Sequence, residues 1–224
     1  MKKIPAKKET LEQLTQRSRA VFARLKQSYP DSKVALLHSS PLELLVSTIL
    51  SAQCTDERVN TVTPNLFKKY RTAHHFANAN PKELEQIIYS TGFYRAKAKN
   101  IINCCKVLIE KYEGKIPDTM EELIQLAGVG RKTANVVLSH AFGKTEGIVV
   151  DTHVGRLARR LGFSKQQNPE AIERDLMSII PKKNWMSIDN LLIWHGRKVC
   201  HARKPKCPEC TINHLCPSAE LFGT

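Results

Sequence analysis

The amino-acid sequence predicts an all-α fold, on three observations. Helix-starting signals recur along the chain, with a capping side chain, a proline and an early acidic residue, as in Ser40-Pro41-Leu42-Glu43 and Asn168-Pro169-Glu170. Apolar residues after these starts repeat with the period of a helix. No segment alternates convincingly between apolar and polar residues over five positions, so no strand is expected.

The first half of the chain contains several expected helices. Residues 10–29 form an amphipathic helix that Pro30 ends. The helix that begins after Ser40 is apolar on almost every side over residues 44–50, which indicates a buried, central position. Further helices are expected after Thr55, after Asn80 and from Phe93 onward. The apolar face of the first helix comprises Leu11, Leu14, Val21, Phe22 and Leu25.

The central motif is the segment Leu126-Ala127-Gly128-Val129-Gly130-Arg131-Lys132-Thr133-Ala134-Asn135, which lies between two expected helices. A capping box at Thr119–Glu122 starts the first helix, which should run to about Gln125. Gly128 and Gly130 permit a tight turn because they carry no Cβ atom. The segment is therefore a helix–hairpin–helix. Its turn amides and positive helix end suit a phosphate, so it should hold nucleic acid by the backbone.

Two side chains near this motif are candidates for chemistry. Lys132 lies in the first turn of the second helix, where the dipole and Arg131 should favour the neutral, nucleophilic amine. By spacing alone, a solvated lysine that contacts phosphate is the better-supported reading. Asp151 follows nineteen residues later, where the N-cap of the next helix belongs. A capping role and a catalytic role for this carboxylate are compatible.

The composition indicates a polyanionic partner. The 224 residues include 42% apolar residues, enough for a packed core, and carry a formal net charge of +14 with a pI near 9.6. The N-terminal segment has lysines but no apolar run, so it is not a secretory signal. No window has the apolar length of a membrane span. Seven cysteines without export indicate a reducing, cytoplasmic compartment.

Four cysteines near the C-terminus form the second strong motif. Cys200, Cys207, Cys210 and Cys216 have the spacing C-x6-C-x2-C-x5-C, which is typical of metal ligands inside a cell. Zinc is the ordinary alternative, although zinc sites usually pair two short C-x2–4-C units and only Cys207–Cys210 is such a pair.

The segment Leu126–Asn135, together with Val150–Val154, closely resembles the endonuclease III family of DNA glycosylases with lyase activity. The similarity extends from about residue 30 to 217. It implies that Lys132 is the Schiff-base nucleophile and Asp151 the essential carboxylate. Ala127 departs from the family, which usually has proline there, but this removes no functional group.

The same resemblance implies a 4Fe–4S cluster that is held by the four cysteines and fixes a basic loop containing Lys204. It implies that Gly128, Gly130 and Arg131 contact the DNA backbone. It also implies that Gln53 enters the gap left by a flipped-out nucleotide and that Phe93 is an apolar wedge. Without the resemblance, a loop-capping glutamine and a core phenylalanine would be preferred.

By resemblance, residues 34–144 form a helical barrel domain with the helix–hairpin–helix, and residues 1–33 plus 145–224 form a cluster domain. Lys132 and Asp151 would face each other across the cleft between them. The implied function is base excision repair: a monomer, associated with the nucleoid, removes oxidised pyrimidines from duplex DNA and cleaves the strand by β-elimination. Its partner is double-stranded DNA with damaged bases or abasic sites, not a membrane.

Two alternatives are weighed against this function. A monofunctional adenine-removing glycosylase of the same superfamily would carry a glutamate on the buried helix, where this chain has Thr48. Such enzymes also lack the hairpin lysine. A non-catalytic DNA-binding or redox-sensing protein would not need Lys132 together with Asp151.

Overall fold

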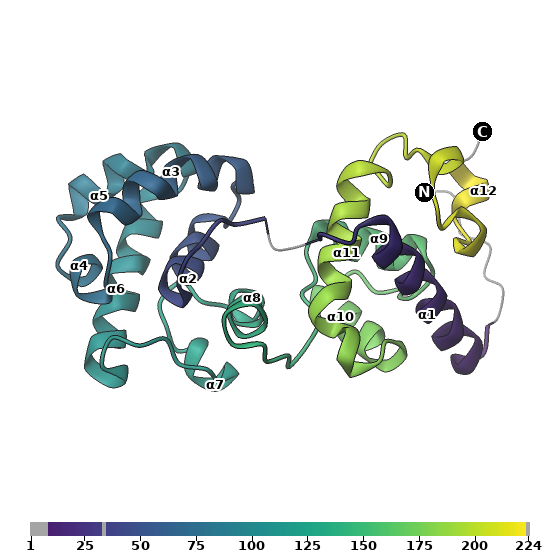
Figure 1. Cartoon of the computed structure of the whole chain (residues 1–224), viewed down its shortest axis with the longest axis horizontal. Coiled ribbons are helices and arrows are strands. Elements are labelled where there is room, and N and C mark those ends of the chain that lie inside the picture. The colour runs from purple at the N-terminus through teal and green to yellow at the C-terminus, as the bar shows by residue number, and fades with distance from the viewer. Residues whose placement is uncertain (1–8, 33–34, 223–224) are drawn as a thin grey trace. The chain divides into compact units, whose positions relative to one another are not determined.

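The computed structural model describes residues 9–32 and 35–222, and the regular elements among these residues are helices (Figure 1). The predicted all-α fold is therefore confirmed. The chain divides into two compact units. One contains the described residues of Val34–Glu146, and the other contains those of Met1–Lys33 together with Gly147–Thr224.

The unit within Val34–Glu146 is built around α2, whose residues 44–50 are all buried, as predicted. Helices α3, α6 and α8 pack against α2, while α4 and α5 pack against α6. Its elements are α2 (Pro41–Leu50), α3 (Asp56–Lys69), α4 (Ala73–Ala77), α5 (Pro81–Ile88), η1 (Tyr89–Thr91), α6 (Tyr94–Tyr112), α7 (Met120–Leu123) and α8 (Arg131–Phe142).

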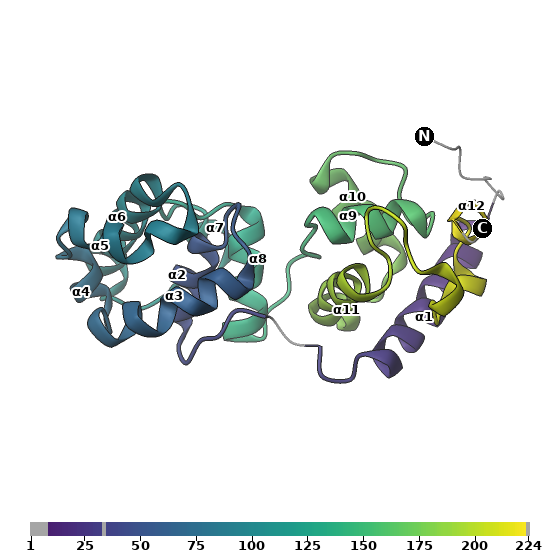
Figure 2. The same cartoon turned by 90° about the horizontal axis from the view of Figure 1, so that it is seen from above.

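The other unit joins the first helix to the last third of the chain. Helix α1 packs against α10, α11 and η4, and Figures 1 and 2 both show it beside these C-terminal elements. Their shared core contains Val21 and Leu25 of α1. The elements are α1 (Leu11–Ser28), α9 (Thr152–Arg160), α10 (Pro169–Ile179), η2 (Lys182–Asn184), α11 (Trp185–Lys198), η3 (Cys207–Glu209), η4 (Asn213–Leu215) and α12 (Ala219–Phe222).

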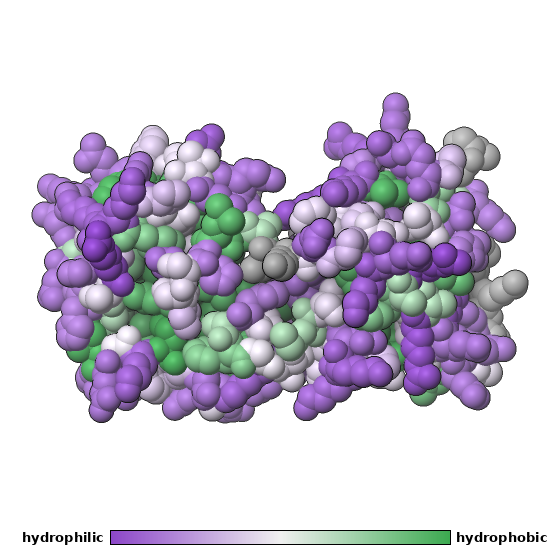
Figure 3. All heavy atoms as spheres, viewed as in Figure 1, coloured by the Kyte–Doolittle hydropathy of each residue, from purple (hydrophilic) through white to green (hydrophobic). Residues whose placement is uncertain are grey.

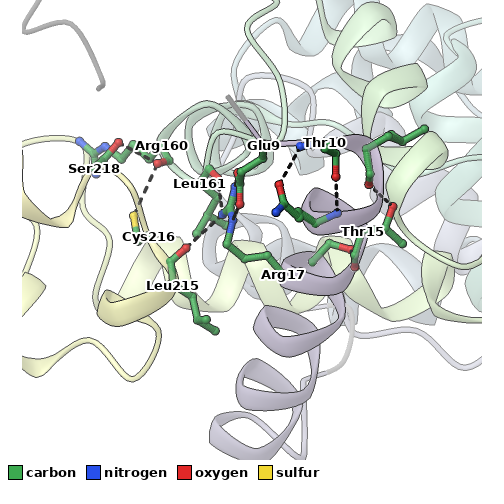
Figure 4. A network of polar contacts seen from close by, with 12 residues as sticks. Glu9, Thr10, Thr15, Arg17, Arg160, Leu161, Leu215, Cys216 and Ser218 are labelled. Carbon is green, nitrogen blue, oxygen red and sulfur yellow. Dashed lines mark hydrogen bonds and ion pairs between the residues drawn. The ribbon is translucent and has the colours of Figure 1, made fainter. Parts of the chain in front are cut away.

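Arg17 links α1 to the end of α9 and to the cysteine loop (Figure 4). Its Nη1 atom donates to the carbonyl oxygens of Leu161, at 2.7 Å, and Leu215, at 3.0 Å. The carboxylate of Glu9 accepts two further hydrogen bonds from the same guanidinium, at 2.8 and 2.6 Å. This bidentate pair fixes the orientation of the guanidinium, so the N-terminal helix braces the loop that follows residue 200.

Local signals placed most helix ends correctly, with a few differences. Leu11 was expected on the buried face of α1 but is 64% exposed, because it lies in the first turn, beyond the core. The five-residue helix α4 was not predicted. Figure 3 shows that hydrophilic residues dominate the visible surface, with smaller hydrophobic patches between them.

Candidate active site and cysteine loop

The hairpin begins with the short helix α7. Thr119 caps this helix by accepting a hydrogen bond from the Glu122 amide at 3.4 Å, as the sequence predicts. The helix ends at Leu123, earlier than the expected Gln125, and turns continue toward α8. The chain therefore approaches the glycines of the motif without a regular helical backbone.

Only one of the two hairpin glycines is required by backbone conformation. Gly128 has a φ of +78°, and a Cβ atom there would lie 2.9 Å from the Cβ of Asn100. Both the left-handed backbone and the close approach of α6 exclude a larger residue. Gly130 has a φ of −96° and is the N-cap of α8, a conformation open to other residues. Both glycines were expected to permit the turn, and the backbone conformation requires glycine at position 128 alone.

Lys132 is exposed in the first turn of α8. The opposite side of the same helix is buried through Ala134, Val137 and Leu138. These buried residues fix the helix in the core, so the position of the Lys132 backbone is set by packing. The adjacent Arg131 is also exposed. The turn thus presents a primary amine and a guanidinium to solvent at the positive end of a helix.

Asp151 is the N-cap of α9, as predicted. Its Oδ1 atom accepts a hydrogen bond from the amide of Val154 at 2.8 Å, and its side chain is partly buried. A carboxylate held in this way has a fixed position and is stabilised by the positive end of the helix. The geometry therefore gives Asp151 a definite structural role that is compatible with chemistry at its exposed part.

The residues after Asp151 connect α9 to α11 and to the start of the cysteine loop. The Nη2 atom of Arg156 donates to the carbonyl oxygens of Gly196, at 3.1 Å, and Cys200, at 3.0 Å. The same atom lies 3.1 Å from Nδ1 of His153. A Cβ atom on Gly196 would come within 2.9 Å of that imidazole, so the two helices cross closely at this glycine.

Three of the sequence-predicted DNA contacts adopt a left-handed backbone. Among the described residues, those with positive φ other than glycine are Gln53, Phe93, Glu113 and Lys204, with φ between 47° and 54°. Such a conformation costs on the order of 1 kcal/mol for a residue with a side chain, and it concentrates at functional sites. Glu113 has an ordinary explanation because it ends α6. For the other three, the strain is a reason to consider function.

Phe93 is not a core residue. Its side chain is 64% exposed, so the interpretation of this phenylalanine as core packing is wrong. Tyr89, 65% exposed, lies nearby in the chain, and its ring packs on that of Tyr94 with a centroid distance of 4.8 Å. Gln53 is also exposed, beyond the end of α2. Both predicted insertion residues are thus accessible to a ligand.

Thr48 lies on α2, near the position where the sequence comparison expects an adenine-removing enzyme to carry an acid. Its side chain is 8% exposed, and its Oγ1 atom donates to the carbonyl oxygen of Leu44 at 2.7 Å. The hydroxyl is therefore satisfied within its own helix. This position offers no ionisable group for catalysis.

The four motif cysteines line one cavity. The space that protein atoms leave free in it is about 430 Å³, including the open mouth. Four cysteine sulfur atoms around one cavity of this size suit a group with several metal atoms. The apolar part of the lining is provided by Leu157, Leu161, Val199, Pro205 and Ile212.

Side-chain N–H groups reach two of the four sulfur atoms. Nη1 of Arg160 donates to Sγ of Cys200 at 3.1 Å, and Nε2 of His195 lies 3.4 Å from Sγ of Cys210. The Arg160 guanidinium also donates to the carbonyl oxygens of His201, at 2.7 Å, and Ala202, at 2.9 Å. Hydrogen bonds and positive charge at sulfur stabilise thiolate ligands. This donor set fits an iron–sulfur cluster.

Sequence analysis did not identify Arg160 or His195 as part of this site. Arg160 belongs to α9 and is distant in sequence from the loop, so only the fold brings it to Cys200. Its backbone carbonyl, on the other side, accepts from Ser218 Oγ at 2.7 Å (Figure 4). Helix α9 contains three arginines, at positions 156, 159 and 160, so nothing local to the sequence distinguishes Arg160 from the other two.

Comparisons with known protein families identify the class of this protein. Residues 46–182 match the family model of HhH-GPD superfamily base excision DNA repair proteins, and residues 200–216 match that of the iron–sulfur binding domain of endonuclease III. The second match spans the four cysteines of the loop. The fold and the loop therefore define a base excision DNA glycosylase with an iron–sulfur centre.

The chain belongs to the endonuclease III family. Endonuclease III of Synechocystis sp. is 53% identical over 205 residues, covering 92% of this chain and 94% of that protein. The Bacillus subtilis protein is 46% identical over 189 residues, covering 84% of this chain and 86% of its own length. A solved structure of a trapped endonuclease III–DNA covalent intermediate is 45% identical to this chain with a TM-score of 0.89, and the match covers 94% of this chain and 99% of that one. The structure of a non-covalent endonuclease III–DNA complex has a TM-score of 0.88 and is 46% identical. This match covers 92% of this chain and 97% of that chain.

The protein is accordingly a DNA-binding enzyme of the DNA glycosylase/AP lyase class, and its cofactor is a 4Fe–4S cluster. The predicted family, enzyme class and cofactor are confirmed. Across the described part of the chain, no helix is long and apolar enough to cross a membrane.

Proposed function

We propose that this enzyme removes oxidised or ring-damaged pyrimidines from duplex DNA and then cleaves the strand through a Schiff base on Lys132. The observation that carries the proposal is the exposed amine of Lys132 in the first turn of α8, directly after the Gly128 hairpin. The relative captured in a covalent intermediate with DNA supports a mechanism with covalent attachment.

In the first step, the Lys132 amine attacks C1′ of the damaged nucleotide as the bond from C1′ to the base breaks. The base leaves with the bonding electrons and takes up a proton. The lysine nitrogen, after losing a proton, then pushes its lone pair toward C1′, which breaks the C1′–O4′ bond; O4′ takes up a proton and the protonated imine remains. Asp151, a fixed carboxylate at the N-cap of α9, stabilises the positive charge that develops on the sugar. It also helps to activate Lys132 by accepting a proton from the attacking nitrogen.

In the second step, the protonated imine makes the C2′ hydrogen acidic. Removal of that proton forms a C1′–C2′ enamine, whose electrons expel the 3′ phosphate and break the strand by β-elimination. Water then hydrolyses the imine and releases Lys132. Each step conserves electrons without an external oxidant, so the chemistry needs no redox change at the cluster.

Binding in this proposal relies on backbone contacts and on two insertion residues. The turn at Gly128 and Gly130 and the Arg131 side chain hold phosphates, and the exposed Lys204 presents another charge to the duplex. Gln53 fills the gap of the extruded nucleotide, while Phe93 wedges into the stack. Unstacking the nucleotide costs a few kcal/mol, and the inserted side chains recover part of that free energy.

The cluster, bound through Cys200, Cys207, Cys210 and Cys216, supplies rigidity to the basic loop. Arg160 and the bracing contacts of Arg17 hold the same loop from the protein side. We further propose the division into a barrel domain, residues 34–144, and a cluster domain, residues 1–33 plus 145–224. A monomer in the cytoplasm, associated with the nucleoid, suffices for this function.

Borohydride trapping tests the proposal. The holoenzyme is mixed with duplex DNA carrying one oxidised pyrimidine and is reduced, and a covalent protein–DNA adduct is sought. The adduct should form with the wild type and with Lys106→Gln, an exposed lysine of α6, and should be absent with Lys132→Gln. An adduct that persists in Lys132→Gln would overturn the assignment. Base release without any adduct, revealed by alkali, would indicate a monofunctional glycosylase.

A further inference from the structure

Lys97 is a buried lysine within the unit that carries the hairpin. Its side chain lies in α6, and the residue is 4% exposed. Its Nζ atom donates to the carbonyl oxygen of Leu50 at 2.7 Å and to that of Thr91 at 2.8 Å. A buried ammonium is costly unless it is hydrogen-bonded, so these two contacts hold it in place. Burial lowers the pKa of Lys97, and the charge of the nearby Cys54 raises it in part.

The two carbonyl groups belong to the two segments that carry Gln53 and Phe93. Leu50 is the last residue of α2, three positions before Gln53. Thr91 is the last residue of η1, two positions before Phe93. The Nζ atom of Lys97 is therefore hydrogen-bonded to the residues that come just before Gln53 and Phe93 in the two segments that carry these side chains.

Local hydrogen bonds transmit the position of each carbonyl to its insertion residue. On the Phe93 side, the buried Thr91 donates from Oγ1 to the carbonyl oxygen of Ile88 at 2.8 Å, and Gly92 follows with φ of 70° and ψ of 159°. That backbone conformation is accessible essentially to glycine alone. The Gly92 amide also donates to the carbonyl oxygen of Tyr89 at 3.3 Å, so local hydrogen bonds hold the backbone that precedes Phe93.

The Gln53 side is fixed in a similar way. The amide of Ser51 donates to the carbonyl oxygen of Ser47 at 2.9 Å, and the amide of Cys54 donates to that of Ser51 at 3.1 Å. Gln53 lies inside this turn with a φ of 53°. The position of Gln53 is therefore set by the C-terminal end of α2, where Lys97 donates to the carbonyl oxygen of Leu50.

We propose that Lys97 is a positioning residue for nucleotide extrusion, which holds the Gln53 and Phe93 segments at the separation at which both side chains enter the duplex around one flipped nucleotide. The inference rests on the DNA roles proposed above for these two residues. Lysine suits this position because one ammonium donates to two carbonyl groups that converge on it. A methionine would fill similar space but would leave both buried carbonyls without this donor.

A double-mutant cycle tests the proposal with the holoenzyme. Extrusion is followed by stopped-flow fluorescence of a 2-aminopurine placed next to the lesion in duplex DNA. Lys97→Met should slow extrusion by about tenfold or more in the wild-type background, because small misplacements carry large kinetic costs. In a Gln53→Ala/Phe93→Ala background, the same substitution should change the rate by less than about twofold, since residues that act as a unit are not additive.

Two matched measurements separate positioning from general damage to the fold. Lys106→Met, an exposed lysine on the same helix, should leave extrusion unchanged. Borohydride trapping on a preformed abasic site in single-stranded DNA should proceed at wild-type rate in Lys97→Met, because no base is extruded from a duplex. If Lys97→Met does not fold, Lys97→Gln enters the same cycle, since its side chain is one atom shorter and its amide nitrogen does not reach the position of Nζ between the two carbonyl oxygens.

The proposal is overturned if Lys97→Met or its replacement slows extrusion equally in both backgrounds, or slows the single-stranded reaction as much as the duplex reaction. It is also overturned if Gln53→Ala/Phe93→Ala slows extrusion and the Lys97 variant does not. If the double alanine variant itself extrudes at the wild-type rate, the DNA roles of Gln53 and Phe93 fail, and the role of Lys97 fails with them. Trapping through Lys132 is unaffected by that result, so the two failures are distinguishable.

Discussion

The hydroxyl oxygen of Tyr29 lies 2.9 Å from Nδ1 of His195, and Nε2 of the same ring lies 3.4 Å from Sγ of Cys210. A neutral imidazole has one donor and one acceptor nitrogen. With Cys210 as a thiolate ligand, the N–H belongs at Nε2, and the Tyr29 hydroxyl then donates to Nδ1. Helix α1 thus sets the tautomer and orientation of a histidine that contacts a proposed cluster ligand.

Tyr29→Phe should therefore weaken retention of the cluster without removing any ligand. Loss of a partner that orients a group next to a metal site typically costs about 10- to 100-fold in metal affinity. The measurement is the rate at which visible absorbance of the cluster disappears in the presence of an iron chelator. Tyr70→Phe is the control, because Tyr70 donates to Glu83 in the other unit. Equal rates in the two variants would contradict this role of Tyr29.

Gly128→Ala should destabilise the hairpin more than Gly143→Ala. Both glycines have positive φ, at 78° and 64°, but a Cβ atom meets Asn100 only at Gly128 and nothing within 4 Å at Gly143. We expect a loss of about 3 kcal/mol at Gly128, from strain and steric overlap, and about 1 kcal/mol at Gly143, from strain. Urea unfolding followed by helical circular dichroism provides the comparison. Similar losses would show that α6 yields to the added methyl group.

Local chemistry explains why so many helix starts could be predicted. Each expected cap at Ser40, Thr55, Asn80 and Asn168 accepts a hydrogen bond from an amide in the first turn of its helix. A cap depends on three or four consecutive residues, so the sequence contains the whole interaction. The same reasoning located the Asp151 cap, although its proposed chemistry depends on partners that local sequence does not specify.

Contacts between distant segments could not be predicted in this way. Lys97 has the residue type of an exposed helical position, and only the packing of α6 against the ends of α2 and η1 buries it. The Tyr29–His195 pair joins residues 166 positions apart. Phe93 has the opposite character, since its apolar type suggests the core while its left-handed backbone directs it to solvent. Burial by residue type fails where a tertiary contact or a function outweighs hydropathy.

Asp189→Asn should stabilise the protein at neutral and alkaline pH. Asp189 is 4% exposed in α11. Its pKa is raised from 3.8 to about 7, mainly by burial and in part by the charge of Asp151, against the lowering effect of the hydrogen bond from the Asn190 amide. The native state therefore holds a proton that the unfolded chain releases near pH 4. The contribution of Asp189 to stability is fully present below that pH and is lost as pH rises to about 7.

The gain from Asp189→Asn should therefore grow from pH 5 to pH 8, toward several kcal/mol at most, and then level off. Thermal melts of both proteins across this range, at matched cluster content, give the difference. Asp175→Asn, a carboxylate that accepts a hydrogen bond from Ser164 Oγ and shows no such burial, is the control. A difference between wild type and Asp189→Asn that does not vary with pH would contradict the proposed protonation.

Gln53→Gly should raise stability while it slows base excision. The left-handed backbone at Gln53 costs a residue with a side chain on the order of 1 kcal/mol, which glycine avoids, apart from the entropy that glycine loses on folding. We therefore expect a gain of up to about 1 kcal/mol, together with slower excision from duplex DNA because the side chain that fills the gap is missing. Thermal melts and single-turnover excision on the same preparation measure both.

Glu113→Gly is the matched control for the expected gain in stability and loss of excision in Gln53→Gly. Glu113 has nearly the same φ, 54° against 53°, but it ends α6 at the opposite end of the helix from Phe93, and its carboxylate makes only an exposed ion pair with Lys115. The substitution should give a similar gain in stability with unchanged excision. If Gln53→Gly also leaves excision unchanged, the strained backbone at Gln53 is an ordinary turn, and its assignment to the extruded nucleotide is wrong. A loss of excision in Gln53→Gly alone would show that the strain is retained for function.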